Sequence, residues 1–258
     1  AKQEKKSGFE AMIAISIFVA VLFTHMNSLP LPIGDTRWYI PTALSTIKEG
    51  NTNLDEYQSI MLPTDYAVQE VNGHLYNLFP LGTSLVSIPP LLLIDHFSSK
   101  VLHFDLYEYV KRSSPVGIEV LIASLVVALT SVVIYLICRI FLNQKRALLL
   151  TFIFAFCTSS WSTASRALWQ HGPSMLMLTA SLYLILLARQ KGYLVTLSAI
   201  PLALSYIIRP TNSISFILIS LFVLVKYRKK IPFILGYIFL SFSIFSIFFL
   251  YNYSIYHS

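Results

Sequence analysis

The stretch VGIEVLIASLVVALTSVVIYLICRIFL, residues 116–142, is apolar along its whole middle and carries a charge only near each end. The hydrocarbon core of a bilayer is about 30 Å thick, so a helix needs roughly 20 apolar residues to cross it. Further apolar stretches occur at 9–29, 147–164, 172–189, 193–208, 211–227 and 231–250. The sequence therefore predicts an all-α, polytopic membrane protein of about seven transmembrane helices, with residues 1–258 forming a single transmembrane domain.

The composition supports this class. Hydrophobic residues make up 55% of the 258 residues and charged residues 12%, with a mean hydropathy of +0.67. A soluble domain of this size would lack the charged side chains needed to cover its surface. The net charge of +7 would suggest a nucleic-acid partner in a soluble protein. Here the basic residues gather at helix ends as topology signals, so we expect membrane lipids and no nucleic acid as partners.

The N-terminal apolar run and the two cysteines each need a separate interpretation. The run 9–29 follows three lysines, is too long for the core of a signal peptide and has no small-residue cleavage site after it, so it is predicted to be an uncleaved signal anchor. Cys138 and Cys157 both fall inside apolar runs, which predicts neither a disulfide nor a zinc site.

The basic residues predict the orientation of the helices. If the apolar stretch 78–97 lies at the membrane interface, 12 of the 19 basic residues fall on short cytoplasmic segments, as the positive-inside rule favours. The N-terminus is then cytoplasmic and the C-terminus extracytoplasmic. The 12 residues are Lys2, Lys5, Lys6, Arg139, Lys145, Arg146, Arg189, Lys191, Lys226, Arg228, Lys229 and Lys230.

The other charged and amphipathic residues agree with this orientation. Ten of the twelve acidic residues lie between Asp35 and Glu119, in or beside the first extracytoplasmic loop. All three tryptophans, Trp38, Trp161 and Trp169, fall near the predicted outer boundary, where amphipathic rings prefer to lie.

The long extracytoplasmic loop, residues 31–115, is expected to contain local structure, because loops of this length usually have a function. Apolar residues at helical spacing, followed by Gly50, predict a short interfacial helix at 36–49. Asn72-Gly73 between the strand-like runs 67–71 and 74–78 predicts a short β-hairpin with a type I′ turn. The stretch 81–97 is predicted to be a second interfacial or re-entrant helix, broken at Pro89-Pro90.

Several carboxylates in this loop are candidates for chemistry. Asp35 follows the first span directly, where it would serve as a general base or bind a metal; the alternative is a cap for the helix that follows. Asp55, Glu56 and Asp65 lie further along the loop, as solvated charges or metal ligands.

Two arginines at outer helix ends oppose the orientation rule and need another explanation. Arg166 lies between the third and fourth predicted spans and Arg209 between the fifth and sixth. A guanidinium group suits a phosphate or diphosphate, which it binds with paired hydrogen bonds. The alternatives are contact with lipid headgroups or an ion pair with a loop carboxylate. His171 would donate to the same anion, or have a structural role.

A set of motifs on the predicted outer side resembles, in its order, the GT-C superfamily of polyprenyl-phosphate-dependent glycosyltransferases. More narrowly, it resembles the bacterial branch related to protein mannosyltransferases and aminoarabinose transferases. The motifs are Gly34-Asp35-Thr-Arg-Trp-Tyr39, Asn72-Gly-His-Leu-Tyr-Asn-Leu-Phe-Pro-Leu-Gly82, Ser165-Arg166, Trp169-Gln-His-Gly-Pro173 and Arg209-Pro-Thr211.

The resemblance implies inverting transfer of a sugar from a polyprenyl-phosphate donor to a protein, lipid or glycan acceptor outside the cytoplasm. Asp35 would be the base, and Arg166, Arg209 and His171 would hold the donor phosphate. A second family carboxylate would correspond to one of Asp55, Glu56 and Asp65, which leaves a divalent metal ion open as a cofactor. Members of the family usually have more spans, so the chain is expected to be the N-terminal part of a longer protein.

Two other functions remain open from the sequence. A non-catalytic integral subunit of a larger membrane complex would fit the short chain. A lipid or ion transporter fits less well, because transporters usually carry charges in mid-membrane and internal repeats, whereas the middles of the predicted spans are nearly free of charge.

Overall fold

A computed structural model of the chain describes residues 2–31 and 33–257, with the backbone alone for residues 2–7, so the side chains of Lys2, Lys5 and Lys6 lie outside the described part. The structure is mostly helical, with 72% helix and 4% strand, as the predicted class requires. The principal elements are α1 (Lys2–Met26), α2 (Tyr39–Lys48), β1 (Val68–Val71), β2 (His74–Asn77), α3 (Gly82–Val101), α4 (Leu106–Val110), α5 (Val116–Phe141), α6 (Gln144–Phe156), α7 (His171–Leu187), α8 (Leu194–Ile208), α9 (Ser213–Lys226) and α10 (Ile231–Tyr256).

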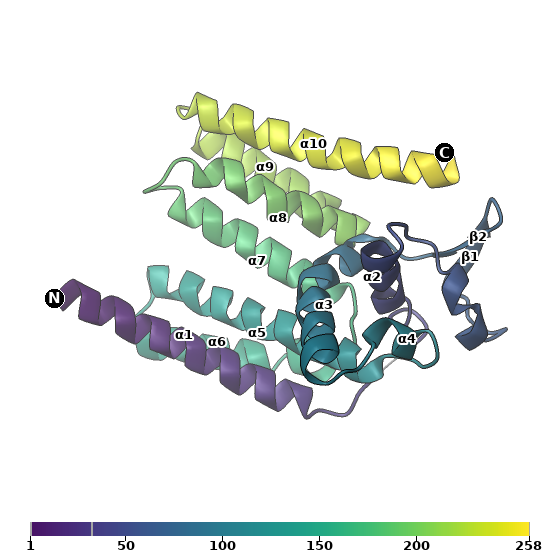
Figure 1. The fold of residues 1–258 in the computed structure, drawn as a ribbon. Coiled ribbons are helices and arrows are strands. Elements are labelled where there is room, and N and C mark those ends of the chain that lie inside the picture. The colour runs from purple at the N-terminus through teal and green to yellow at the C-terminus, as the bar shows by residue number, and fades with distance from the viewer. Residues whose placement is uncertain (1, 32, 258) are drawn as a thin grey trace.

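The long helices form a bundle with all of the loop structure at one end. In Figure 1, α1 and α5 to α10 lie side by side, while α2, α3, α4 and the hairpin gather where α1 ends. We call this the loop end of the bundle. The C-terminus lies at the loop end and the N-terminus at the opposite end. The main helix pairs are α1 with α5, α5 with α7, α7 with α8 and α8 with α10.

Helix length separates the bundle helices into two groups. Within the described residues, three helices are long and apolar enough to cross a membrane: Gly8–Met26, Val116–Phe141 and Ile231–Tyr256. The apolar helices His171–Leu187, Leu194–Ile208 and Pro210–Lys226 are shorter. At 1.5 Å per residue, a helix of 15 residues covers only about 22 Å of a core of about 30 Å. The structure is consistent with a membrane protein, and seven crossings remain a prediction.

The apolar run predicted as one span at 147–164 is not a single continuous helix. Helix α6 ends at Phe156, and Ser160–Ala164 form a separate short turn, η2. The hydroxyl of Thr158 donates to the carbonyl of Phe154 at 2.7 Å and accepts from the backbone N–H of Ser160 at 3.2 Å. Hydroxyl side chains that bond to nearby backbone groups compete with helix formation, which explains why the run of threonine and serine stops the helix.

The first predicted loop helix is confirmed, but it is enclosed in protein instead of resting one face on lipid. Helix α2 is buried from Tyr39 to Ser45. The polar residues on it satisfy their hydroxyls within the helix: Thr42 donates to the carbonyl of Trp38 at 2.7 Å, and Ser45 to that of Pro41 at 3.1 Å. This makes α2 the centre of a hydrophobic core that the loop shares with α5 and Leu168.

The predicted break at Pro89-Pro90 is also wrong, since α3 runs through both prolines without interruption. The prolines remove two helical donors. The helix nevertheless packs against α2 and α8, with Leu91 fully buried just beyond the prolines. We attribute the continuity to this packing.

The hairpin is confirmed. Strands β1 and β2 pair antiparallel with Gln69 opposite Tyr76. Asn72 has φ of 54° and Gly73 has φ of 83°, the positive values that a type I′ turn requires at both central residues.

Gly82, at the start of α3, sets the distance between the loop and the bundle. A Cβ atom at this position would lie 2.5 Å from the backbone N of Ile208 and 2.7 Å from the carbonyl carbon of Ile207, at the end of α8. Only a residue without a side chain permits this approach. The N-terminus of α3 is thereby placed directly against the segment that carries Arg209.

At the opposite end of the bundle, an ion pair joins α1 to α5. The guanidinium of Arg139 contacts Glu10 at 2.5 Å, and the hydroxyl of Tyr135 donates to the same carboxylate at 2.7 Å. Arg139, counted as a topology signal in the sequence, therefore also holds two helices together.

We predict that Gly82→Ala lowers the thermal unfolding temperature of the detergent-solubilised protein. The added methyl group meets backbone, which cannot rotate away, and overpacking of this kind costs about 1–3 kcal/mol. Gly117→Ala is the matched control, because a Cβ atom there meets nothing within 4 Å. An unfolding temperature for Gly82→Ala equal to that of the control would contradict this account of the α3–α8 contact.

Candidate functional site

A small cavity at the loop end brings three of the predicted site residues together. Its volume is about 130 Å³, and Asp35, His171 and Arg209 all line it. These residues come from the segment before α2, the first turn of α7 and the end of α8. We call this the Asp35 cavity; its other lining residues are Thr36, Tyr39, Phe79, Trp169 and Gln170.

Asp35 lines the cavity and does not cap α2. The residue that caps α2 is Trp38, and no side chain makes a capping hydrogen bond there. The Asp35 carboxylate instead accepts a hydrogen bond from the hydroxyl of Tyr66. The Tyr66 ring lies against Gly34, where a Cβ atom would come within 2.8 Å of it. The Gly34-Asp35 pair thus lets the tyrosine reach the carboxylate.

The electrostatics of this contact keep Tyr66 in its protonated form. The hydrogen bond to Asp35 raises the pKa of Tyr66 above its ordinary value, because the phenolate would face a carboxylate. Tyr66 therefore acts as a donor that orients one oxygen of Asp35.

Arg209 is the cation of the cavity. Its backbone is extended, with φ of −146° and ψ of 103°, which ends α8 and turns the side chain out of the helix. Asn212, just beyond it, donates to Ser174 of α7 at 2.6 Å and to the carbonyl of Ser205 at 2.9 Å, which fixes the junction. Within the described part of the chain, no side chain forms a hydrogen bond or ion pair with the Arg209 guanidinium.

His171 lies beside Arg209 at the start of α7. Its ring stacks on that of Trp169, with 6.2 Å between centroids and 23° between planes. Both His171 and Arg209 also line a larger neighbouring cavity of about 400 Å³ between α7 and the α8–α9 junction. A helix N-terminus and an arginine together favour an anion at this position.

The structure adds a contact between two residues that were not selected individually as site residues from the sequence. The side-chain amide of Gln170 donates to the hydroxyl of Tyr39 at 2.8 Å, which connects α2 to α7 across the Asp35 cavity. Burial raises the pKa of Tyr39, so its hydroxyl stays protonated. Both residues belong to motifs quoted from the sequence, but nothing local in either motif signals that the two side chains meet.

Glu119 supports the site from behind. It is 2% exposed, and its carboxylate accepts a hydrogen bond from the backbone N–H of Leu168 at 2.9 Å. This bond ties α5 to the segment that leads into Trp169 and His171. A single acid in an otherwise apolar run was the available signal, because buried charges in such runs are rarely without a role.

Arg166 lies apart from the other predicted site residues. Its Nε donates to the carbonyl of Leu29 at 2.6 Å, and its own carbonyl accepts from the N–H of Leu31 at 2.9 Å. It lines a different cavity, together with Ser28 and Trp161. Arg166 thus fixes the chain where it leaves α1, and its predicted role in phosphate binding has no support from this arrangement.

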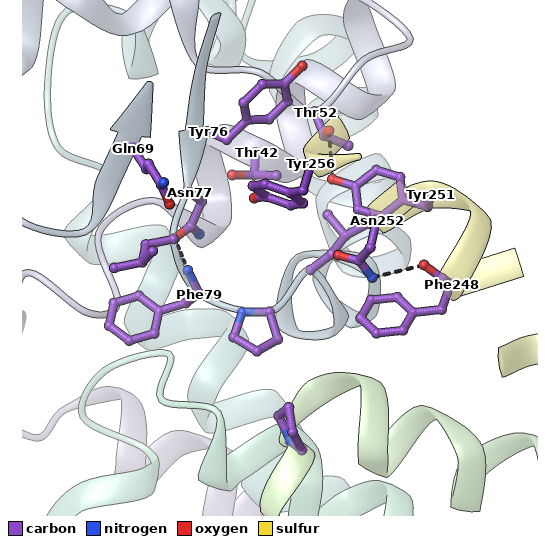
Figure 2. Close-up of a pocket in the computed structure, with 14 residues that line it drawn as sticks. Thr42, Thr52, Gln69, Tyr76, Asn77, Phe79, Phe248, Tyr251, Asn252 and Tyr256 are labelled. Atoms are coloured by element: carbon purple, nitrogen blue, oxygen red, sulfur yellow. Dashed lines mark hydrogen bonds between the residues drawn. The ribbon is translucent and has the colours of Figure 1, made fainter. Parts of the chain in front are cut away.

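A further cavity lies between the hairpin and the C-terminal end of α10 (Figure 2). Its volume is about 370 Å³. The side chains of Thr52 and Tyr251 share a hydrogen bond of 2.8 Å across it, and the amide of Asn72 donates to the carbonyl of Ile255 at 3.2 Å. These contacts hold α10 against the hairpin. We call this space the hairpin cavity.

Two of the three further loop carboxylates are engaged in structural contacts. Asp55 pairs with His74 at 2.6 Å and so attaches the hairpin to the preceding turn, η1 (Asp55–Ile60). Asp65 pairs with Arg37 at 3.1 Å. Neither lines the Asp35 cavity.

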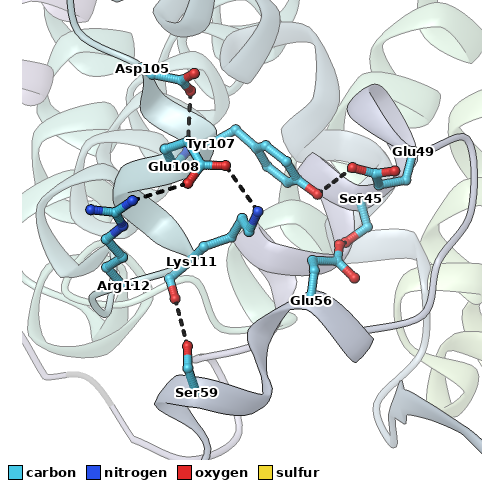
Figure 3. A network of polar contacts seen from close by, with 9 residues as sticks. All are labelled: Ser45, Glu49, Glu56, Ser59, Asp105, Tyr107, Glu108, Lys111 and Arg112. Atoms are coloured by element: carbon cyan, nitrogen blue, oxygen red, sulfur yellow. Dashed lines mark hydrogen bonds and ion pairs between the residues drawn. The ribbon is translucent and has the colours of Figure 1, made fainter.

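The third, Glu56, belongs to the polar network shown in Figure 3, where it accepts a hydrogen bond from Ser45. In the same network, Tyr107 donates to Glu49 at 2.6 Å. Of the residues described, the structure therefore places no second carboxylate on the Asp35 cavity. Within the described chain, no group of three or more histidine, cysteine, aspartate or glutamate side chains is arranged to hold a metal ion.

The chain matches no protein-family profile, no curated protein sequence and no solved structure. The motifs quoted above therefore carry the family resemblance by themselves.

We predict that Arg209→Gln abolishes anion binding whereas Arg166→Gln does not. Inorganic pyrophosphate that binds only the folded state stabilises it by RT ln(1 + [L]/Kd), which a thermal shift measures. We expect Arg209→Gln to lose this shift at pyrophosphate concentrations that stabilise the unaltered protein. Arg166→Gln loses the bond to Leu29, so it should unfold at a lower temperature while keeping the shift. Loss of the shift in Arg166→Gln with retention in Arg209→Gln would instead place the anion in the cavity that Arg166 lines with Ser28 and Trp161.

Proposed function

We propose that this chain is a membrane glycosyltransferase of the GT-C type, which transfers a sugar from a polyprenyl-phosphate donor to an acceptor on the extracytoplasmic face. The observation that carries the proposal is the shared cavity of Asp35, His171 and Arg209. It combines a carboxylate with a cation that no other described side chain neutralises. Glycosyl transfer from a phosphate donor needs a group of each kind.

The residues divide the chemistry between them. The oxygen of the acceptor hydroxyl attacks the anomeric carbon and its proton passes to Asp35, which Tyr66 orients. The bond from that carbon to the donor phosphate breaks, and the phosphate keeps the electron pair. Arg209 stabilises the charge that develops on the leaving phosphate, and His171 donates to the same group. Asp35 and Arg209 therefore act on opposite sides of the reacting carbon.

The proposed topology has seven crossings, with the N-terminus in the cytoplasm and the loop end outside. Two features support it. The termini lie at opposite ends of the bundle, as an odd number of crossings requires. The basic connections α5–α6, α7–α8 and α9–α10 all lie at the end opposite the loop (Figure 1), where the positive-inside rule expects them.

A second candidate function is a non-catalytic integral subunit of a larger membrane complex. The absence of a second carboxylate from the Asp35 cavity, among the residues described, favours it over a metal-dependent enzyme. In such a subunit the cavity would bind a lipid phosphate without cleaving it.

The experiment that separates the two functions is Asp35→Asn in the protein that contains this chain. Asparagine keeps the shape of the side chain and the hydrogen bond from Tyr66 but accepts no proton from the acceptor. We expect sugar transfer to fall by about 10²–10⁴-fold, the usual contribution of a general base. The measurement is incorporation of radiolabelled sugar from polyprenyl-phosphate mannose, glucose and aminoarabinose into membranes of expressing cells.

Asp55→Asn is the matched control, because Asp55 is a loop carboxylate outside the Asp35 cavity. It should keep its transfer activity. Unchanged transfer by Asp35→Asn at normal expression would exclude the enzyme and leave the subunit. Loss of transfer by Asp55→Asn alone would instead identify Asp55 as the catalytic carboxylate.

A further inference from the structure

The hairpin cavity adjoins the Asp35 cavity, and the two share one wall. Phe79 lines both of them, and Pro210, the neighbour of Arg209, lines the hairpin cavity. The other walls come from the hairpin, the start of α2 and the last turns of α10, as Figure 2 shows. A ligand held in the hairpin cavity therefore lies next to the site of the proposed chemistry.

The lining of the hairpin cavity carries no charged side chain among the residues described. It consists of aromatic rings, hydroxyls, amides and a few apolar groups: Thr42, Thr52, Gln69, Tyr76, Asn77, Leu78, Phe79, Pro80, Leu81, Pro210, Phe248, Tyr251, Asn252 and Tyr256. The neighbouring Asp35 cavity, in contrast, is lined by an acidic residue, Asp35, and a basic one, Arg209. An ionised ligand would find no counter-charge in the hairpin cavity, so the lining suits a neutral polar molecule.

Several polar groups on this lining have hydrogen-bonding capacity to spare. In the described structure, no side chain or backbone group bonds to the amide of Gln69 or to the hydroxyls of Tyr76 and Tyr256. Asn252 uses only its amide N–H, toward the carbonyl of Phe248 at 2.9 Å, and Asn77 only its oxygen, toward the N–H of Phe79 at 3.0 Å. Amides that offer a donor and an acceptor side by side match adjacent hydroxyl groups.

Aromatic surfaces complete the lining. The rings of Tyr76 and Tyr256 lie 6.4 Å apart at 55° to each other, one from the hairpin and one from α10. Figure 2 shows Tyr256 between the side chains of the hairpin and those of α10. The C–H face of a sugar ring packs against such rings, while its hydroxyls reach the amides around them.

We propose that the hairpin cavity binds an uncharged saccharide. Its volume of about 370 Å³ falls within the range of small-molecule sites. The bond between Thr52 and Tyr251 and the contact of Asn72 with Ile255 hold the two walls in place, so the site is formed before the ligand arrives. The inference rests on the proposed function only for the source of the saccharide, which is either the sugar of the donor lipid or an acceptor glycan.

Saturation-transfer-difference NMR tests the proposal directly. Free glucose, mannose and galactose would each be added to the protein in nanodiscs, with saturation applied to the aromatic protons. We expect transfer to the ring C–H protons of at least one sugar. Gln69→Ala and Tyr256→Leu should each weaken binding by about tenfold, the effect of losing one good hydrogen bond or ring contact.

Glu70→Gln is the matched control, because Glu70 neighbours Gln69 on β1, is exposed and does not line the cavity. It should bind like the unaltered protein. Retention of the pyrophosphate thermal shift shows that each variant is folded, since that shift depends on Arg209. Equal binding by Gln69→Ala, Tyr256→Leu and the control would overturn the proposal. A serine-containing peptide would be tested in the same NMR experiment. Binding of this peptide, with no binding of any of the three sugars, would also overturn the proposal.

A competition experiment identifies the source of the saccharide. If the cavity holds the sugar of the donor, the free sugar that binds displaces polyprenyl-phosphate mannose or glucose. If it holds an acceptor glycan, the free sugar and the lipid bind together. Either result supports the saccharide site. Sugar binding that persists in Asp35→Asn while transfer also persists would refute the proposed catalysis and leave the saccharide site standing.

Discussion

The contact between Gly82 and the end of α8 is the constraint on which the loop end depends. A Cβ atom added at Gly82 would lie 2.5 Å from the backbone N of Ile208, so the start of α3 and the end of α8 contact each other through their backbones. Helix α3 packs in turn against α2, and α2 follows Asp35 by a few residues. The position of the acid relative to Arg209 is therefore set by a chain of rigid contacts that starts at one glycine.

Charge is divided sharply over short distances in this region. Several loop carboxylates outside the Asp35 cavity have protein partners, as Asp65 has Arg37 and Asp55 has His74. Arg209 has no such partner within the described residues, although it stands in a cavity with one acid. This contrast favours a bound anion over a purely structural arginine.

The sequence predicted what local chemistry determines. Asn72-Gly73 demanded a type I′ turn and produced one, and Gly50 ended α2 close to the expected residue. It failed where local and tertiary effects compete. The hydroxyl of Thr158 stopped α6 within an apolar run, and packing carried α3 through two prolines.

Pairings between distant segments were beyond the sequence altogether. No local feature of the sequence around Glu119 indicates that its carboxylate accepts a hydrogen bond from Leu168. In the same way, nothing around Arg166 indicates that its side chain donates to the carbonyl of Leu29. Arg166 and Arg209 are both arginines at predicted outer helix ends, so the sequence does not distinguish them. In the fold, Arg166 donates to a backbone carbonyl, whereas Arg209 lines the Asp35 cavity. The carboxylates and arginines were the right residue types to select, but their grouping is a property of the fold.

The ion pair between Glu10 and Arg139 has a consequence for how the chain is made. The two residues are 129 positions apart, so the ribosome finishes α1 long before it reaches α5. At about 5–20 residues per second, the delay is on the order of ten seconds. The ion pair between α1 and α5 therefore forms late in biogenesis, only after the whole loop has been synthesised.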